Sequence, residues 1–181
     1  PSSPVGGYNF LLSELSEGNA MALMLNKAQI YGAPDLANAS ETALQSLFQR
    51  VGGNPLALKL VVGLNYDLAI PQILGALVQV NVQEVEDLYR LIYRNVWQMI
   101  SNPAKKLLEI MPLAAEGGMG QAQMLAVSHL EEDQLFKAIQ ELSRRSLLEV
   151  RGTPSKKRYA IHSLTRTFLM SEIIQWFEET P

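Results

Sequence analysis

Two short stretches of the chain carry residues whose type and position could bind an anion or a base. The first is His162, which ends a β-compatible segment and is followed by Ser163, a residue type that caps helices. A helix that begins there offers unpaired backbone N–H groups and a partial positive charge, and an imidazole adds a hydrogen-bond donor. His162 is therefore a candidate anion contact, although an ordinary strand histidine with a local hydrogen bond explains the same pattern.

The second stretch is VGGNPLALKL, from Val51 to Leu60. Its two glycines, Gly52 and Gly53, are typical of a helix end, where a left-handed turn favours glycine. Asn54 is a good helix cap, and Pro55 suits the first helical position because the N–H that it lacks has no helical partner there. The residues that follow are apolar almost all round, which is typical of a buried helix. The stretch therefore predicts a sharp corner that leads into the core.

A cluster of basic residues lies near the C-terminal end. Between positions 144 and 166 there are seven Lys or Arg against one acid, and Arg144, Arg145, Lys156, Lys157 and Arg158 are the candidate nucleic-acid contacts among them. Lysines on a wing hairpin could reach a DNA phosphate. A solvated turn and a helix end account for the same charges. The preceding helix begins with three acids, which would repel phosphate, so we do not expect nucleic acid as the main partner.

The rest of the composition excludes several kinds of chemistry. The chain has 181 residues, no Cys, two His and a formal net charge of −3. Disulfides and thiolate metal sites are therefore excluded, and no metal-ligand cluster or activated nucleophile is apparent. A phosphate-binding loop of the form G-x-x-x-x-G-K-[ST] does not occur. No apolar run approaches the length of a membrane span, so we expect no membrane association. We also expect no catalysis by this chain, because the phosphate-binding loop and an activated nucleophile are missing from it.

The elements that would position these residues divide the chain near position 102. Residues 16–101 show apolar residues at helical spacing and predict a helical bundle. Residues 102–181 predict three helices, then a β-hairpin with strands Leu147–Val150 and Tyr159–His162, then a final helix capped by Ser163. That order is the order of a winged helix. The predicted fold class is mostly α: a helical bundle followed by a winged-helix domain with one small β-hairpin.

Both stretches resemble motifs of one protein family. VGGNPLALKL resembles the Gly-x-Pro motif, commonly GG-x-PLAL, of the NB-ARC nucleotide-binding proteins, which belong to the STAND class of signal-transduction ATPases. YAIHSL, from Tyr159 to Leu164, resembles their MHD motif, in which a His closes the winged-helix part. Ile161 stands here for the Met, and Ser163 for the Asp, so the charge of that Asp is missing. The two motifs occur in the order that the family uses.

The resemblance implies a regulatory role in a larger, cytoplasmic protein. Residues 1–15 would be a linker or the end of a preceding nucleotide-binding domain, residues 16–101 a helical ARC-like subdomain, and residues 102–181 the winged-helix subdomain. The missing nucleotide-binding domain of the same polypeptide would be the main partner, and we expect this chain to be a fragment of that protein.

In the parent, the resemblance places Pro55 against the adenine of bound ADP or ATP and His162 at the β-phosphate of ADP, and it makes Gly53 a further cofactor-binding residue. ATP exchange would swing the winged helix away and allow the parent to self-assemble. The fragment alone would hold no cofactor and hydrolyse no ATP. Two alternatives remain open at this point: a winged-helix DNA-binding or transcription-regulatory module, and a plain helical protein-interaction domain.

Overall fold

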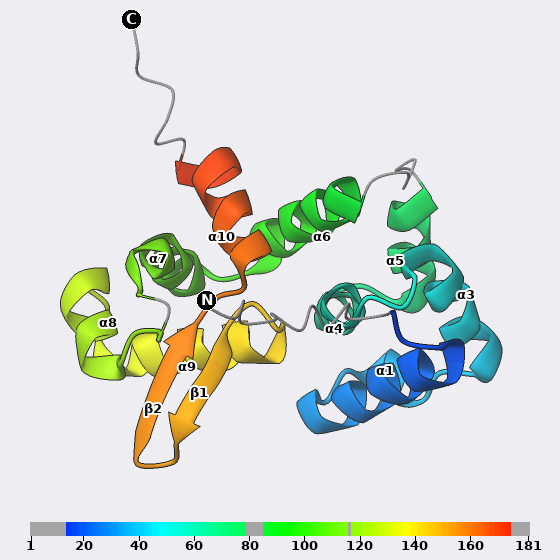
Figure 1. Cartoon of the computed structure of the whole chain (residues 1–181), viewed down its shortest axis with the longest axis horizontal. Coiled ribbons are helices and arrows are strands. Elements are labelled where there is room, and N and C mark those ends of the chain that lie inside the picture. Colours follow the sequence, from blue (N-terminus) through cyan, green and yellow to red (C-terminus); the bar gives the residue numbers. More distant parts are fainter. Residues whose placement is uncertain (1–13, 79–84, 116, 175–181) are drawn as a thin grey trace, which may run out of the picture.

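The computed structural model describes residues 14–78, 85–115 and 117–174 of the chain. Within them the protein is mostly helical and carries one small two-stranded antiparallel sheet toward the C-terminal end (Figure 1). The predicted fold class, a helical bundle followed by a unit with one small hairpin, is confirmed. Of the predicted linker, residues 1–13 lie outside the described residues.

The helical half is built around one buried helix, α4. Its helices are α1 (Glu17–Tyr31), α2 (Pro34–Ala37), α3 (Glu41–Val51), α4 (Pro55–Leu64), α5 (Ile70–Val78) and α6 (Val85–Met99). Helix α4 packs against α1, α3 and α6, and seven of its ten residues are buried. The helix that the sequence predicts as apolar all round is therefore the centre of this half, because each of its faces has a neighbouring helix to bury it.

The second half has the element order predicted for a winged helix. It comprises α7 (Asn102–Ile110), a short 3₁₀ turn η1 (Met111–Leu113), α8 (Gln121–Ser128), α9 (Glu132–Arg144), β1 (Glu149–Thr153), β2 (Lys156–Ala160), α10 (Ser163–Phe168) and a π-helical continuation η2 (Leu169–Ile174). The strands pair from Glu149 with Ala160 to Thr153 with Lys156. Met119 forms a further antiparallel bridge with Tyr159, which fastens the loop before α8 to the hairpin.

Three local predictions need correction. The strands extend further toward the tip than expected, so β1 includes Arg151 and Thr153, and the turn shrinks to residues 154–155. The final helix is capped by His162 and begins at Ser163. Asn102-Pro103 repeats the Asn54-Pro55 pair and predicts the same kind of cap, but α7 is capped by Ser101, whose hydroxyl accepts the Ala104 N–H. The apolar pattern of the final helix predicts that it includes Trp176 and Phe177, which lie outside the described residues.

The two halves meet through two pairs of helices. Helix α4 approaches the end of α9 so closely that a Cβ added at Gly63 would lie 2.7 Å from the backbone oxygen of Arg145. Helix α10 packs across α6, as the orange and green helices of Figure 1 show. The buried residues of both halves form one continuous hydrophobic core. Among the described residues, no helix combines the length and the apolar character needed to cross a bilayer.

Candidate functional site

The corner before α4 is closed by the side chain of Asn54. Its Oδ1 accepts the backbone N–H groups of Leu56 at 3.0 Å and Ala57 at 3.4 Å, as a helix cap should. The same atom also accepts the Tyr89 hydroxyl at 2.7 Å. Pro55 follows as the first helical residue, and its ring is exposed. The predicted cap is confirmed, and the corner presents the proline to its surroundings while α6 holds the cap in place.

The two glycines of the corner serve different purposes. Gly52 has a φ of +74°, a conformation that L side chains rarely adopt. Gly53 is needed for a close contact, because a Cβ there would lie 2.2 Å from the Leu15 carbonyl oxygen. The Gly53 carbonyl accepts the Leu15 N–H at 2.8 Å. The start of the described chain is therefore bound directly to the corner, and Gly53 is buried beneath it.

His162 is the N-cap residue of helix α10. Its Nδ1 accepts the Leu164 N–H at 3.2 Å, and the residue is half-buried. Because Nδ1 is the acceptor, the neutral ring carries its proton on Nε2, which is the nitrogen left to donate outward. The predicted position beside a helix N-terminus is confirmed, while the predicted cap at Ser163 moves by one residue.

A set of aromatic side chains connects Asn54 to α10. Tyr89 and Tyr93, one turn apart on α6, stack with ring centroids 6.2 Å apart, and Tyr93 stacks on Phe168 of α10 at 5.2 Å. The Tyr93 hydroxyl lies 2.8 Å from the hydroxyl of Thr165, and both residues are buried. We call Asn54, Tyr89, Tyr93, Thr165 and Phe168 the α6 ladder. It joins the residue beside Pro55 to the helix that His162 caps.

The side chains of the two tyrosines in the ladder are buried. Burial raises the pKa of the Tyr93 hydroxyl far above its ordinary value, and the hydrogen bond to Thr165 opposes this only in part. Burial also raises the pKa of Tyr89. Both phenols therefore stay protonated at physiological pH and act as fixed hydrogen-bond partners. The helical spacing of Tyr89 and Tyr93 predicts a place in the core or at a subdomain interface, and both residues are buried.

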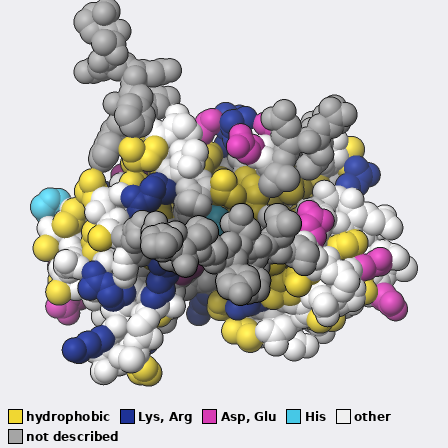
Figure 2. All heavy atoms as spheres, viewed as in Figure 1, with side chains coloured by type: hydrophobic (Ala, Val, Ile, Leu, Met, Phe, Trp, Pro, Cys, Tyr) yellow, Lys and Arg dark blue, Asp and Glu magenta, His cyan; other side chains and the backbone are white. Residues whose placement is uncertain are grey.

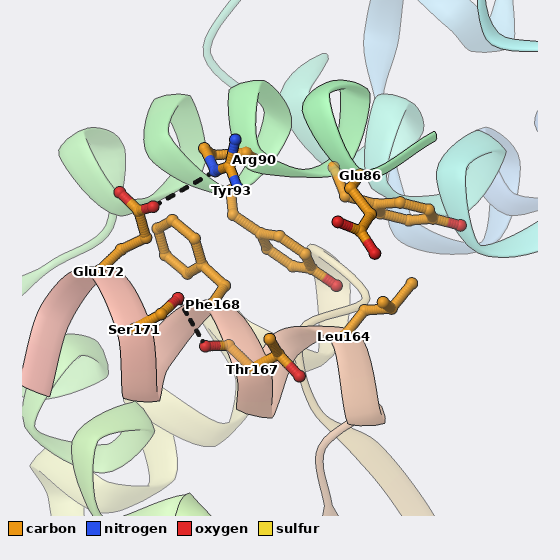
Figure 3. Close-up of a pocket in the computed structure, with 9 residues that line it drawn as sticks. Glu86, Arg90, Tyr93, Leu164, Thr167, Phe168, Ser171 and Glu172 are labelled. Carbon is orange, nitrogen blue, oxygen red and sulfur yellow. Dashed lines mark hydrogen bonds and ion pairs between the residues drawn. The ribbon is translucent and has the colours of Figure 1, made fainter. Parts of the chain in front are cut away.

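A groove runs along the exposed edge of the ladder, between α6 and α10 (Figure 3). Tyr93, Leu164 and Phe168 give it an apolar floor, while the Glu86 side chain reaches toward Leu164 from the α6 side. At its other end, Glu172 bonds to Arg90 at 3.2 Å and to Arg94 at 2.5 Å. The groove encloses about 160 Å³. That volume is below the ~300 Å³ at which ligand pockets begin, so this groove alone is too small for a nucleotide.

The structure divides the basic cluster. Arg145 is buried, forms a two-pronged ion pair with Asp67, and lies with its guanidinium 5.8 Å from the centre of the Tyr66 ring. Arg158 donates to the carbonyls of Gly117 at 3.0 Å and Gly118 at 2.5 Å. Arg145 is therefore engaged by contacts inside the fold, whereas Arg158 is exposed and bonds to the loop before α8. A contact of either arginine with nucleic acid stays a prediction.

Four of the five candidates lie at the surface. Arg144 lies at the end of α9, and Lys156, Lys157 and Arg158 lie on β2, all of them exposed. On the face shown in Figure 2, the visible Lys and Arg side chains form separate groups with neutral surface between them. The acids Glu131, Glu132 and Asp133 are exposed at the start of α9, as predicted. The described residues on this face therefore do not form the continuous basic surface that favours duplex binding.

The comparisons with known proteins assign no function to this chain. Within the described residues, no group of three or more His, Asp or Glu is placed to hold a metal ion. No protein-family model matches the chain, and no curated protein sequence matches it at a significant level.

Proposed function

We propose that this chain is the regulatory part of a STAND-class signal-transduction ATPase. In this proposal, residues 16–101 and 102–181 close over ADP or ATP held by a nucleotide-binding domain of the same polypeptide. The motifs around Pro55 and His162 motivate the proposal, and the order of helices and hairpin is compatible with it. The chain acts as a sensor of nucleotide state and not as the catalyst, because it lacks a phosphate-binding loop.

The observation that carries the proposal is the α6 ladder. A regulator must transmit a change at the base end of a nucleotide to the element at the phosphate end, and it needs a physical connection to do so. Asn54, beside Pro55, bonds to Tyr89, and Tyr93 bonds to Thr165, three residues after His162. A displacement of α10 from α6 breaks the Tyr93–Thr165 bond and the stack on Phe168 together.

His162 supplies the phosphate contact in this proposal. The bond from the Leu164 N–H to Nδ1 fixes the ring and leaves Nε2–H as a donor in the neutral form. A donor held in one orientation loses little entropy on binding an oxygen of phosphate. The exposed Pro55 ring offers an apolar surface for a base. Neither contact encloses a nucleotide, so the proposal expects the chain alone to bind ADP weakly.

The test replaces His162 by Asn in the parent protein. Asn is itself a good N-cap, so His162→Asn keeps a cap on α10 while it removes the Nε2–H donor. We expect ADP affinity to fall about tenfold, the effect of one charge-assisted hydrogen bond, and spontaneous activation to rise. The matched control is His129→Asn. His129 is exposed between α8 and α9 with a φ of +54°, which Asn tolerates. Unchanged ADP affinity and basal activity in His162→Asn would contradict the proposal.

A further inference from the structure

A second candidate site lies in a cleft between the two halves of the molecule. It is formed by α1 and α4 on one side and by the end of α9 and β1 on the other (Figure 1). The cleft has a volume of about 470 Å³, and its lining includes three cations from three separate elements: Lys27, Lys59 and Arg151. These residues are far apart in sequence, so the cluster arises only through folding.

The two lysines of this cleft are not paired with any carboxylate that the structure describes. Lys27 and Lys59 are half-buried, and neither has an ion-pair partner within 4.0 Å among the described residues. The Lys27 ammonium lies 5.2 Å from the centre of the Tyr31 ring, a cation–π contact that positions it. Like charges that line one cleft repel each other, and a bound anion would relieve that repulsion.

The remaining lining adds hydroxyl groups and one acid. Ser143 lines the cleft, and its buried Oγ has no hydrogen-bond partner in the described part of the chain. Ser146 also lines it and is held in a left-handed conformation, with a φ of +59°. Glu149 bonds to Arg151 at 2.7 Å. Among the described residues that line the cleft, three cations stand against this one carboxylate, a formal balance of +2.

We propose that this cleft binds a small phosphate-bearing anion through Lys27 and Lys59. The two ammonium groups meet the charge of the phosphate, and Ser146, which also lines the cleft, can donate its hydroxyl. Neither Pro55 nor His162 is among the residues that line the cleft, so this site is separate from the proposed nucleotide contacts. Its position between α4 and β1 means that a bound anion joins the two halves.

The test uses the 181-residue chain and pyrophosphate at low ionic strength. Titration calorimetry measures binding, and backbone amide chemical shifts locate it. We expect saturable binding, with shifts confined to the end of α9, β1 and the neighbouring turns of α1 and α4. In Lys27→Gln/Lys59→Gln the affinity falls about tenfold or more, because two charge-assisted contacts are lost.

The matched control is Lys156→Gln/Lys157→Gln, which removes the same charge from the exposed hairpin. Its affinity for pyrophosphate stays within about twofold of the parent chain. An equal loss in both variants, or shifts centred on the hairpin, overturns the proposal, because the attraction would then be non-specific. Absence of binding overturns it too. Should the double variant fail to fold, Lys59→Gln alone is compared with Lys157→Gln by the same criteria.

Discussion

The hydroxyl groups of Tyr93 and Thr165 lie 2.8 Å apart although the two residues are separated by 72 positions in the chain. Tyr93 is on α6 of the helical half, and Thr165 is on α10 of the winged-helix half. Both side chains are buried, and the Tyr93 ring also stacks on Phe168. A hydrogen bond in a dry interface specifies one alignment of two helices, because any other alignment leaves a hydroxyl without a partner.

Replacing Tyr93 by Phe removes one hydroxyl and leaves the Thr165 hydroxyl without that partner. We expect the free energy of unfolding to fall by about 1–2 kcal/mol, the penalty for a buried polar group that loses its bond. Urea denaturation measures the change. The variant keeps the aromatic ring, so the stack on Phe168 persists and the loss reports on the hydroxyl pair.

A double-mutant cycle with Thr165→Val isolates that pair. Once Tyr93 is Phe, the Thr165 hydroxyl has already lost its bond, so its removal costs less than in the parent chain. The expected coupling is about 1 kcal/mol. Additive losses in the two single variants and the double variant would show that the two hydroxyls do not stabilise each other.

Local chemistry made the corner before α4 predictable. A glycine pair, an Asn and a Pro determine a helix end and a helix start over four consecutive residues, and the structure contains both. The bond from Tyr89 to Asn54 spans 35 positions and leaves no trace in a local pattern. The sequence could therefore identify the corner that carries Pro55 but not the α6 ladder that is bonded to Asn54.

The basic cluster shows the same limit. Arg145 was counted with its sequence neighbours, but its partner Asp67 is 78 positions away, in the loop between α4 and α5. The strand ends at the hairpin tip were misjudged because Gly152, Pro154 and Ser155 are typical turn residues and the lysines beside them are exposed. Pairing of β1 with β2 satisfies the backbone there whatever the side chains are.

Gly63→Ala tests the close approach of α4 to α9. An added Cβ would lie 2.7 Å from the Arg145 backbone oxygen and 2.9 Å from its Cα, and backbone atoms cannot turn aside as a side chain can. We expect a loss of about 2 kcal/mol or more, which outweighs the helix-propensity gain of about 1 kcal/mol. The matched control is Gly75→Ala in α5, where a Cβ meets nothing within 4 Å. Gly75→Ala should stabilise the chain, and a similar gain in Gly63→Ala would contradict the close contact.

Asp67→Asn tests the ion pair that joins the two halves beside this contact. Asn keeps the shape but removes the charge, so the guanidinium of Arg145, whose side chain is 9% exposed, is left with Glu141 at 3.8 Å. We expect a loss of about 1–3 kcal/mol that persists in large part at high salt, since a partly buried pair is screened less than an exposed one. The control is Asp133→Asn, whose pair with Lys137 is exposed on both sides. That variant should lose less than about 0.5 kcal/mol. Equal losses of stability in Asp67→Asn and Asp133→Asn would contradict a buried position of Arg145 between the two halves.

Alkaline pH should weaken the fold through the α6 ladder. Burial raises the pKa of Tyr93 in the folded state well above the value of about 10 for an unfolded tyrosine. Below pH 10 both states keep the proton, and this contribution to stability is complete. As the pH rises above 10 the unfolded state loses the proton first, so the free energy of unfolding falls by about 1.4 kcal/mol per pH unit for this residue. The loss continues until the pH reaches the raised pKa of the folded state.

Tyr93→Phe removes that proton from the equilibrium. Although the variant is less stable at neutral pH, its free energy of unfolding should fall less steeply above pH 10. The difference between the two slopes should correspond to the ionisation of one group. Tyr89, whose pKa burial also raises, keeps part of the slope in the variant. Urea denaturation at a series of alkaline pH values gives both slopes. Parallel curves for the two proteins would mean that Tyr93 ionises as easily in the folded chain as in the unfolded one, and hence that α10 does not seal the ladder against water.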